Sequence, residues 1–194
     1  MRFSLGIFMC LMLLLTGCGF HLRGAEPLAP PFHHLYLQSN DPYSELTRYL
    51  KQSLKLSQVD FASTATSSSL ILNITEQQTQ QLLGVGGTQQ TRLYNLSLIV
   101  TYEITDPQGK ILVPVEKITE NRTVTIQASQ VLGGSNEESN LYQQMRRAAV
   151  FDIMLRLASP KTTAAVNQQE TNNENSLATA RTTPSKNTSA HLSH

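Results

Sequence analysis

The strongest constraint on the fold of this 194-residue chain is a stretch of alternating apolar and polar residues at 96–104. Its apolar members occupy every second position: Leu96, Leu98, Val100, Tyr102 and Ile104. Because successive side chains of a β-strand point to opposite faces, this pattern predicts a strand with one buried face. A second alternation begins at Leu70 and can continue to Gln81. We therefore predict a sheet with one face packed on a core and one facing water.

The segment before these strands predicts one strand followed by one helix. Residues 33–38 alternate as a short first strand. Asp41 is a suitable N-cap and Pro42 suits the first helical position, where its missing N–H is not needed. Apolar residues from Tyr43 to Leu54 then follow at helical spacing. The small polar residues at 63–69 predict a loop.

Glycine and proline signals predict two turns that link the strands. The glycine-rich stretch 84–87 reverses the chain, and Asp-Pro-Gln-Gly at 106–109 is typical of a type I turn. The returning strand begins with Ile111 and resumes at 123–126. Pro114 lies within it and cannot donate a ladder hydrogen bond, which predicts an edge strand or a bulge.

A second helix is predicted after Gly133-Gly134, capped by Ser135 or Asn136 and ending near Leu157. Its second half is apolar nearly all round, with Ala, Val, Phe, Met and Leu side chains at 148–155. A sheet covers only one side of such a helix. We expect the first helix to cover more of it, and a partner protein is the alternative.

Residues 160–194 are rich in Thr, Asn, Ser, Gln and Ala without apolar periodicity, which predicts a disordered tail. The predicted element order is then β-α-β-β-β-α. We predict an α+β fold, with one mostly antiparallel four-stranded sheet and two helices packed on one face.

The N-terminus has the features of a bacterial lipoprotein signal. Arg2 precedes an apolar run at 5–15, which is too short to span a bilayer and matches the hydrophobic region of a secretory signal peptide. Leu15-Thr16-Gly17-Cys18 resembles a lipobox, which implies lipidation of Cys18 and cleavage before it. The alternative is an ordinary signal peptide with an incidental cysteine.

These boundaries divide the chain into a signal peptide at 1–17, an anchor and proline-containing linker at 18–32, a domain at 33–159 and the tail. Loss of Arg2 leaves 14 basic and 14 acidic side chains, so we expect no nucleic-acid partner. Cys10 leaves with the signal peptide, and Cys18 is the lipid acceptor. The mature domain has no other cysteine, so we expect packing alone to stabilise it.

Catalytic and metal-binding motifs are not found in the sequence. There is no Gly-x-Ser-x-Gly elbow and no His-Glu-x-x-His pair. His33 and His34 are adjacent, and adjacent strand residues point to opposite faces, so they make a poor chelate. The glycines at 84–87 lack the lysine of a phosphate-binding loop and lead into a strand. We expect no enzyme activity, cofactor or metal.

Much of the predicted sheet surface is polar without being charged. Gln, Thr, Asn and Ser dominate residues 75–81, 88–91 and 127–130. Strands that face water have this composition, and so does a surface suited to the polar lumen of a transmembrane barrel. The composition alone does not choose between these two interpretations.

The segment Cys-Gly-Phe-His-Leu-Arg-Gly at 18–24 resembles the mature start of the LPS-assembly lipoproteins of the LptE family. The rest agrees in layout, with Asp41-Pro42 opening a helix and a long helix near Arg146-Arg147. The resemblance covers residues 18–159. In bacterial lipoproteins an Asp after the lipidated cysteine signals retention at the inner membrane, and Gly19 stands there instead, which favours the outer membrane.

The resemblance implies a plug inside the outer-membrane β-barrel LptD that supports barrel assembly and helps lipopolysaccharide reach the outer leaflet. It also implies lipopolysaccharide binding by basic residues near one end of the domain. The loops 83–88 and 132–136 contain no Lys or Arg, so the nearest candidates are Arg92, Lys117 and Arg122. Each can pair with phosphate, or can simply be a solvated strand cation.

We place the lipopolysaccharide contact at Arg92. The alternative function is a stand-alone envelope lipoprotein that binds lipid or anchors the envelope without a barrel partner. An envelope enzyme ranks third, since no pairing of nucleophile and base is visible.

Overall fold

The computed structural model describes residues 28–87, 91–127, 131–168 and 171, and the side chains of 131–135 are not described. The predicted signal peptide and Cys18 lie outside these residues. The elements, in chain order, are η1 (Pro30–His33), β1 (His34–Ser39), α2 (Glu45–Leu56), β2 (Asp60–Phe61), η2 (Ala65–Ser67), β3 (Leu70–Val85), β4 (Thr91–Thr105), β5 (Ile111–Gln127) and α3 (Val131–Leu157).

The strands form one five-stranded mixed sheet in the order β2-β1-β3-β4-β5. The pairs β3–β4 and β4–β5 are antiparallel, while β1 pairs in parallel with both β2 and β3. The predicted α+β class and the antiparallel ladder are confirmed. The predicted four-stranded sheet is wrong, because the two-residue strand β2 is too short to show an alternation. The parallel pairing follows from α2, which crosses from β1 to β3 and returns the chain in the same direction.

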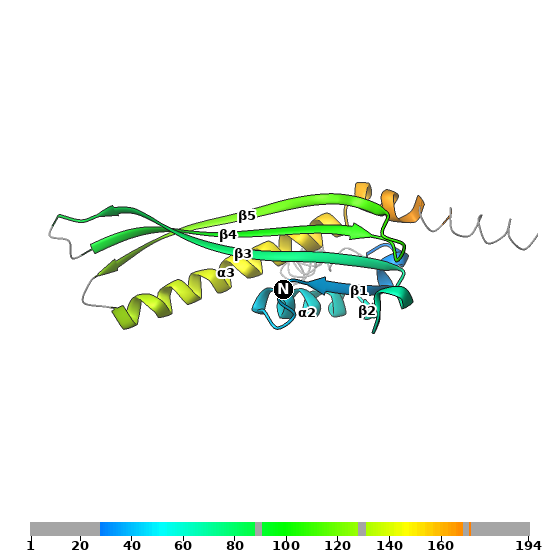
Figure 1. Cartoon of the computed structure of the whole chain (residues 1–194), viewed down its shortest axis with the longest axis horizontal. Coiled ribbons are helices and arrows are strands. Elements are labelled where there is room, and N and C mark those ends of the chain that lie inside the picture. Colours follow the sequence, from blue (N-terminus) through cyan, green and yellow to red (C-terminus); the bar gives the residue numbers. More distant parts are fainter. Residues whose placement is uncertain (1–27, 88–90, 128–130, 169–170, 172–194) are drawn as a thin grey trace, which may run out of the picture.

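The molecule is elongated because β3, β4 and β5 are much longer than the other strands. β1 pairs only with the 70–74 part of β3, so the sheet narrows to a three-stranded ribbon beyond Ile74. α2 and α3 pack together on one face of the sheet, and α3 continues along the ribbon (Figure 1).

The first helix begins later than predicted. Ser44 is the N-cap of α2, and its hydroxyl accepts a hydrogen bond from the Thr47 N–H at 3.1 Å. Asp41 instead accepts from the Tyr43 N–H at 3.0 Å, so Asp41 and Pro42 belong to the turn before the helix. Tyr43 is 96 % exposed and does not join the apolar face. Ser44, and not Asp41, caps the helix because its hydroxyl stands three residues before a backbone N–H that has no partner within the helix.

The alternation in β4 is confirmed. Its even-numbered side chains from Leu96 to Ile104 are buried and face the helices. They pack with buried side chains of β1, β3, α2 and α3 in one core, whose fully buried large members include Phe32, Leu35, Leu46, Leu50, Leu54, Leu70, Leu72, Met145 and Ile153.

The last strand, β5, runs without interruption and forms one edge of the sheet. Its register with β4 shifts between the pairs Tyr102–Glu116 and Ile104–Val113, so Pro114 lies at a bulge on an edge strand. The prediction for Pro114 is therefore confirmed. The 106–109 turn is also confirmed, because the Gly109 N–H donates to the Asp106 carbonyl at 3.0 Å.

The second helix is longer than predicted at its start. α3 includes Gly133, Gly134, Ser135 and Asn136, so the predicted cap at Ser135 or Asn136 is wrong. Two glycines weaken a helix by about 1 kcal/mol each without ending it. The predicted end at Leu157 is confirmed. Among the described helices, none is both long enough and apolar enough to cross a bilayer.

The chain does not become disordered at residue 160. A further helical segment covers 160–168, and its Val166 side chain is buried in the core. Val166 is the one buried apolar side chain of this segment and the other buried side chain, Thr162, is polar, which was too weak a signal to distinguish the segment from the polar tail. The remainder of the predicted tail, apart from residue 171, lies outside the described residues.

Candidate functional site

The face of the sheet that points away from the helices is polar and nearly uncharged. Leu98 faces the core, so the residues before and after it on β4, Ser97 and Ile99, face the open side. Residues that are paired across neighbouring strands point to the same face of the sheet. The open-face rows are Gln77–Ile99–Thr119, Thr79–Ser97–Asn121 and Gln81–Asn95–Thr123. In the described strands, the charged side chains on this face are Asp60, Glu103 and Lys117, all towards the end that carries β1. We call these three rows the open sheet face.

A network of ion pairs anchors α3 to the rest of the domain. The Arg146 guanidinium donates to Glu76 on β3 at 2.8 Å and to Glu45 on α2 at 3.1 Å. The Arg146 and Glu76 side chains are 14 % and 7 % exposed. This guanidinium lines a polar hollow between α2, β3 and α3, and we assign it a structural role because both acids already pair with it.

A second polar cluster joins α3 to the bulged part of β5. The Tyr102 hydroxyl donates to Glu116 at 2.8 Å, and Arg156 donates to the same carboxylate at 3.0 Å. The Tyr102 hydrogen bond and the nearby Arg156 charge lower the pKa of Glu116. Burial, together with the Glu116 carboxylate, raises the pKa of Tyr102 well above its usual range. The charges are satisfied within the cluster, so it positions α3 and is not a reaction centre.

The ribbon end of α3 is held by a tyrosine. The Tyr142 hydroxyl donates to the Thr79 carbonyl at 2.9 Å, beyond the point where β1 stops pairing with β3. Burial raises the pKa of this tyrosine. Tyr142 therefore satisfies a strand-edge carbonyl and leaves the open sheet face on the other side of the ribbon uncovered.

The structure separates the three candidate cations. Arg92 and Arg122 lie on the helix side of the ribbon, because Arg92 faces the same way as Leu96, whose cross-strand partner is Arg122. They stand four residues apart along β4, or about 13 Å. Lys117 pairs with Thr101 on the open side. Lys117 and Arg122 are five residues apart on an unbroken part of β5, so strand alternation puts them on opposite faces. The separation was missed because the strand was predicted to resume only at residue 123.

The two arginines also differ in their partners. Arg122 pairs with Glu120 at 3.4 Å and donates to the Asn121 carbonyl at 2.7 Å. Arg92 is exposed, and within the described ranges 28–87, 91–127 and 131–168 no ion pair to it is found. Of the two arginines, Arg92 is therefore the one whose charge is available to an anion.

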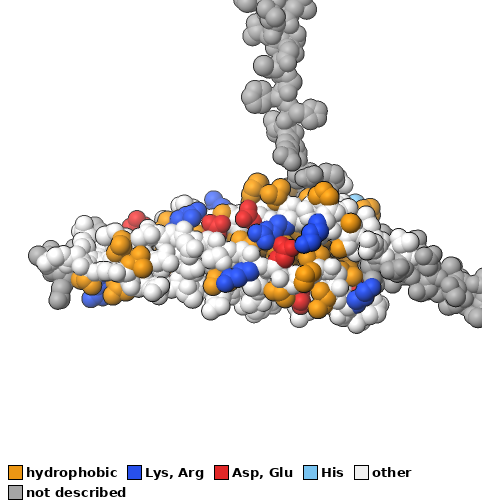
Figure 2. Space-filling view, turned by 90° about the horizontal axis from the view of Figure 1, so that it is seen from above, with side chains coloured by type: hydrophobic (Ala, Val, Ile, Leu, Met, Phe, Trp, Pro, Cys, Tyr) orange, Lys and Arg blue, Asp and Glu red, His pale blue; other side chains and the backbone are white. Residues whose placement is uncertain are grey.

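Exposed apolar side chains gather at the end of the ribbon (orange, at left in Figure 2), the end at which Arg92 pairs with Val85. They are Leu82, Leu83, Val85 and Leu93, which are between 38 % and 53 % exposed. A register shift between Leu82 and Gly84 places one extra residue in β3 there. This bulge explains why the adjacent side chains of Leu82 and Leu83 are both about half exposed. The sequence pattern did not indicate the bulge.

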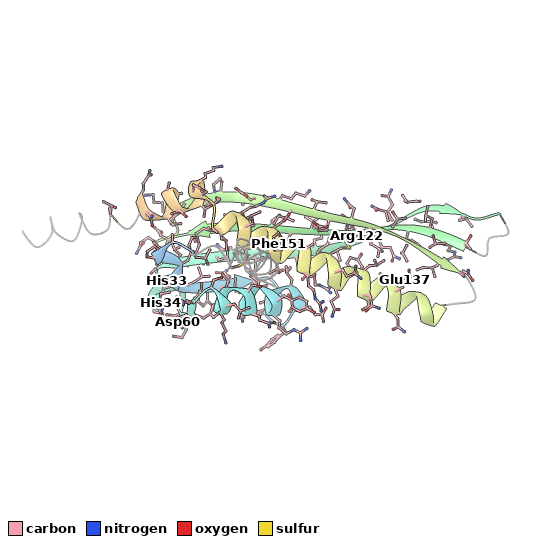
Figure 3. The ribbon with its side chains drawn as sticks, turned by 180° about the vertical axis from the view of Figure 1, so that it is seen from behind. His33, His34, Asp60, Arg122, Glu137 and Phe151 are labelled. Carbon is pink, nitrogen blue, oxygen red and sulfur yellow. The ribbon has the colours of Figure 1, made fainter. Side chains whose placement is uncertain are left out.

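Metal-binding side chains do not cluster in the described part of the chain, where no group of three or more His, Cys, Asp or Glu residues is suitably placed. His33, His34 and Asp60 lie at the β2 end of the sheet (Figure 3). His33 ends η1 and His34 begins β1.

Known proteins resemble this chain over most of its length. The family model described as "LptE: Lipopolysaccharide-assembly" matches residues 32–157. The LPS-assembly lipoprotein LptE of Pectobacterium atrosepticum is 28 % identical over 148 residues, which are 75 % of this chain and 79 % of the relative. The protein of the same name from Yersinia enterocolitica is 29 % identical over 161 residues, covering 82 % and 77 % of the two chains.

Solved structures share the fold. Rare lipoprotein B from Shewanella oneidensis has a TM-score of 0.54 and 25 % identity, covering 73 % of this chain and 98 % of that one. Lipoprotein B from Nitrosomonas europaea has a TM-score of 0.60 and 23 % identity, covering 77 % and 96 %.

Proposed function

This chain belongs to the LptE lipopolysaccharide-assembly family, and from that premise we propose that it is a non-catalytic outer-membrane lipoprotein. In this proposal it plugs the β-barrel LptD, supports assembly of that barrel and helps deliver lipopolysaccharide to the outer leaflet. The lipid on Cys18 holds it at the membrane.

The open sheet face is the observation that supports the plug. The lumen of a transmembrane β-barrel is lined by polar side chains, and a plug must replace the water that would otherwise bind them. Gln, Thr, Asn and Ser side chains donate and accept hydrogen bonds without the desolvation cost of a buried charge. The rows around Ser97 and Thr79 offer such groups over most of the ribbon.

The ribbon end supports the proposed contact with lipopolysaccharide. That lipid combines phosphate groups with acyl chains. Arg92 is exposed at the end of the ribbon that carries the four outward apolar side chains, where its cross-strand partner Val85 shares its face and Leu93 faces the open side. A guanidinium pairs well with phosphate, while apolar side chains pack against acyl chains. Arg122 is a weaker candidate because it already pairs with Glu120, and Lys117 lies on the opposite face.

Affinity purification of the tagged, lipidated chain from detergent-solubilised outer membrane tests the proposal. We expect a stoichiometric β-barrel partner of far greater mass. Ser97→Arg, at the centre of the open sheet face, should reduce recovery of the barrel, because a charge there is buried on docking. Gln52→Arg, at an exposed position of α2, is the matched control and should leave recovery unchanged.

Recovery of the lipoprotein alone, without any barrel, would favour the stand-alone envelope lipoprotein. Equal recovery for Ser97→Arg and the wild type would move the barrel contact to another surface.

A further inference from the structure

A continuous surface on the helix layer combines exposed cations with exposed apolar side chains. The Arg48 and Arg147 guanidiniums lie over the same Tyr49 ring, 5.1 and 5.2 Å from its centroid. Arg147, Phe151 and Leu155 then follow one another at i, i+4 spacing along α3, which places them on one helix face. We call these five residues the helix-layer stripe; Figure 3 labels Phe151 on α3.

The apolar members of the stripe are left outside the core. Phe151 is 68 % exposed and Leu155 is 50 % exposed, although α2 packs beside α3. The neighbouring helix was expected to cover the second half of α3, and it leaves these two side chains open. Two large apolar side chains exposed on one helix face make this surface a candidate for binding.

The charges beside the stripe favour an anionic ligand. α2 carries Arg48 and Lys55 on one face against one acid, Glu45, and that acid pairs with Arg48 at 3.2 Å and with Arg146. Its other cation, Lys51, lies towards β1. Asp152 is the acid next to Phe151 on α3, and its field acts on Arg156. The α2 side of the stripe therefore has a net positive charge.

We propose that the helix-layer stripe docks on the phosphate headgroup layer of an anionic lipid bilayer. Phe and Leu side chains beside Arg and Lys are the combination that lies in the boundary between headgroups and acyl chains. Cations near an anionic membrane surface add electrostatic attraction to this apolar contact. A polar barrel lumen fits this surface poorly, because it offers no apolar partner to Phe151 and Leu155.

The lipid anchor of the proposed function makes this docking geometrically accessible. Nine residues, 19–27, lie between Cys18 and Leu28, whose side chain is buried in the core. Fully extended, the stretch from Cys18 to Leu28 reaches about 35 Å. This is close to the length of α3, whose 27 residues span about 40 Å. The inference rests on that anchor and is independent of the barrel partner.

Tryptophan fluorescence tests the docking directly, since the chain contains no Trp. Phe151→Trp in the full lipidated chain supplies a single indole, and Leu155→Trp is a second probe. Each is reconstituted through its lipid into phosphatidylcholine vesicles with or without about 30 % phosphatidylglycerol, an anionic lipid, with brominated acyl chains as quencher. Ser97→Trp on the open sheet face is the matched control.

We expect emission to shift to shorter wavelength and to be quenched at both helix positions only with phosphatidylglycerol. Added salt and the double change Arg48→Ser, Arg147→Ser should each abolish the effect, and the Ser97→Trp indole should stay unquenched. Co-sedimentation with both vesicle types verifies the tether separately.

Three results would overturn the inference. The first is unshifted emission in tethered protein with anionic vesicles. The second is a shift already present without lipid, which would indicate cover by the chain's own N-terminal segment or a second copy. The third is a shift only when the barrel partner is added, which would make the stripe a protein interface.

Discussion

The Arg146 guanidinium on α3 and the Glu76 carboxylate on β3 pair at 2.8 Å, although the residues are 70 positions apart in the chain. Both side chains are largely buried, and Arg146 also reaches Glu45 on α2. One side chain thus links three elements of the domain at the place where the sheet narrows. The sequence showed a pair of adjacent arginines there without indicating that they differ so much in burial.

Arg146→Met should destabilise the domain by about 3 kcal/mol, because it leaves the Glu76 charge in a buried site without its cationic partner. Urea unfolding followed by circular dichroism measures this change. The Gln78 amide still donates to Glu76, but it carries no charge. Arg147→Met, on the exposed neighbour, is the control and should stay within about 0.5 kcal/mol of the wild type. A loss below about 1 kcal/mol for Arg146→Met would show that the ion pair contributes little.

Glu116 should make stability fall at acidic pH. Its folded-state pKa is lowered by the Tyr102 hydrogen bond and by Arg156, so its contribution is present above the ordinary value of 4.5 and is lost as pH falls through the lowered value. Glu116→Gln should therefore be less stable than the wild type at pH 7, and the gap should narrow below pH 4.5. Urea midpoints measured across this range test the sign; a gap that widens on acidification contradicts it.

Tyr102 should make stability fall at alkaline pH. Its pKa is raised by burial and by Glu116, so its contribution is full below the ordinary value of 10.0 and is lost as pH rises above it. Tyr102→Phe should remove this alkaline loss of stability, which urea midpoints near and above pH 10 measure. The Tyr36→Phe variant is the control, because Tyr36 does not contact Glu116. An unchanged alkaline loss in Tyr102→Phe would assign it to other groups.

The strands were predictable where one face is buried along their whole length. In β4, every second side chain from Leu96 to Ile104 is buried without interruption, so the apolar alternation in the sequence predicts this strand correctly. β5 does not keep its phase. Val113 is buried, while Ile111 and Val115 are more than half exposed, because the register with β4 shifts on both sides of Val113. The sequence pattern of β5 was therefore interpreted as two separate strand segments.

Leu98→Ala should cost about 3 kcal/mol of stability, because the fully buried leucine leaves a cavity between sheet and helices. Ile99→Ala, the next residue and on the open sheet face, should cost about 1 kcal/mol. Urea denaturation of both variants measures the difference. Equal losses would mean that the open face is packed as tightly as the core.

The functional surface was less predictable than the fold. The polar composition around 75–81 was visible, but composition alone did not show that these residues align in uncharged rows across three strands. Which residues align across the strands depends on the register of pairing between β3, β4 and β5. The bulges at Leu83 and Pro114 shift this register near the two ends of the sheet. The helix-layer stripe was visible only as an apolar excess at 148–155.

Arg92→Ala should weaken lipopolysaccharide binding by the full-length lipoprotein without unfolding it. Its guanidinium is exposed and stands beside the apolar end of the ribbon, so the loss of one charged contact to phosphate should reduce affinity by about tenfold. Lys117→Ala is the matched control, because it removes one cation from the opposite face of the same sheet. Binding is measured with purified lipopolysaccharide in detergent, and unfolding midpoints verify the fold. Unchanged affinity in Arg92→Ala would remove Arg92 from the site, and an equal loss in Lys117→Ala would show that overall charge, and not this position, sets the affinity.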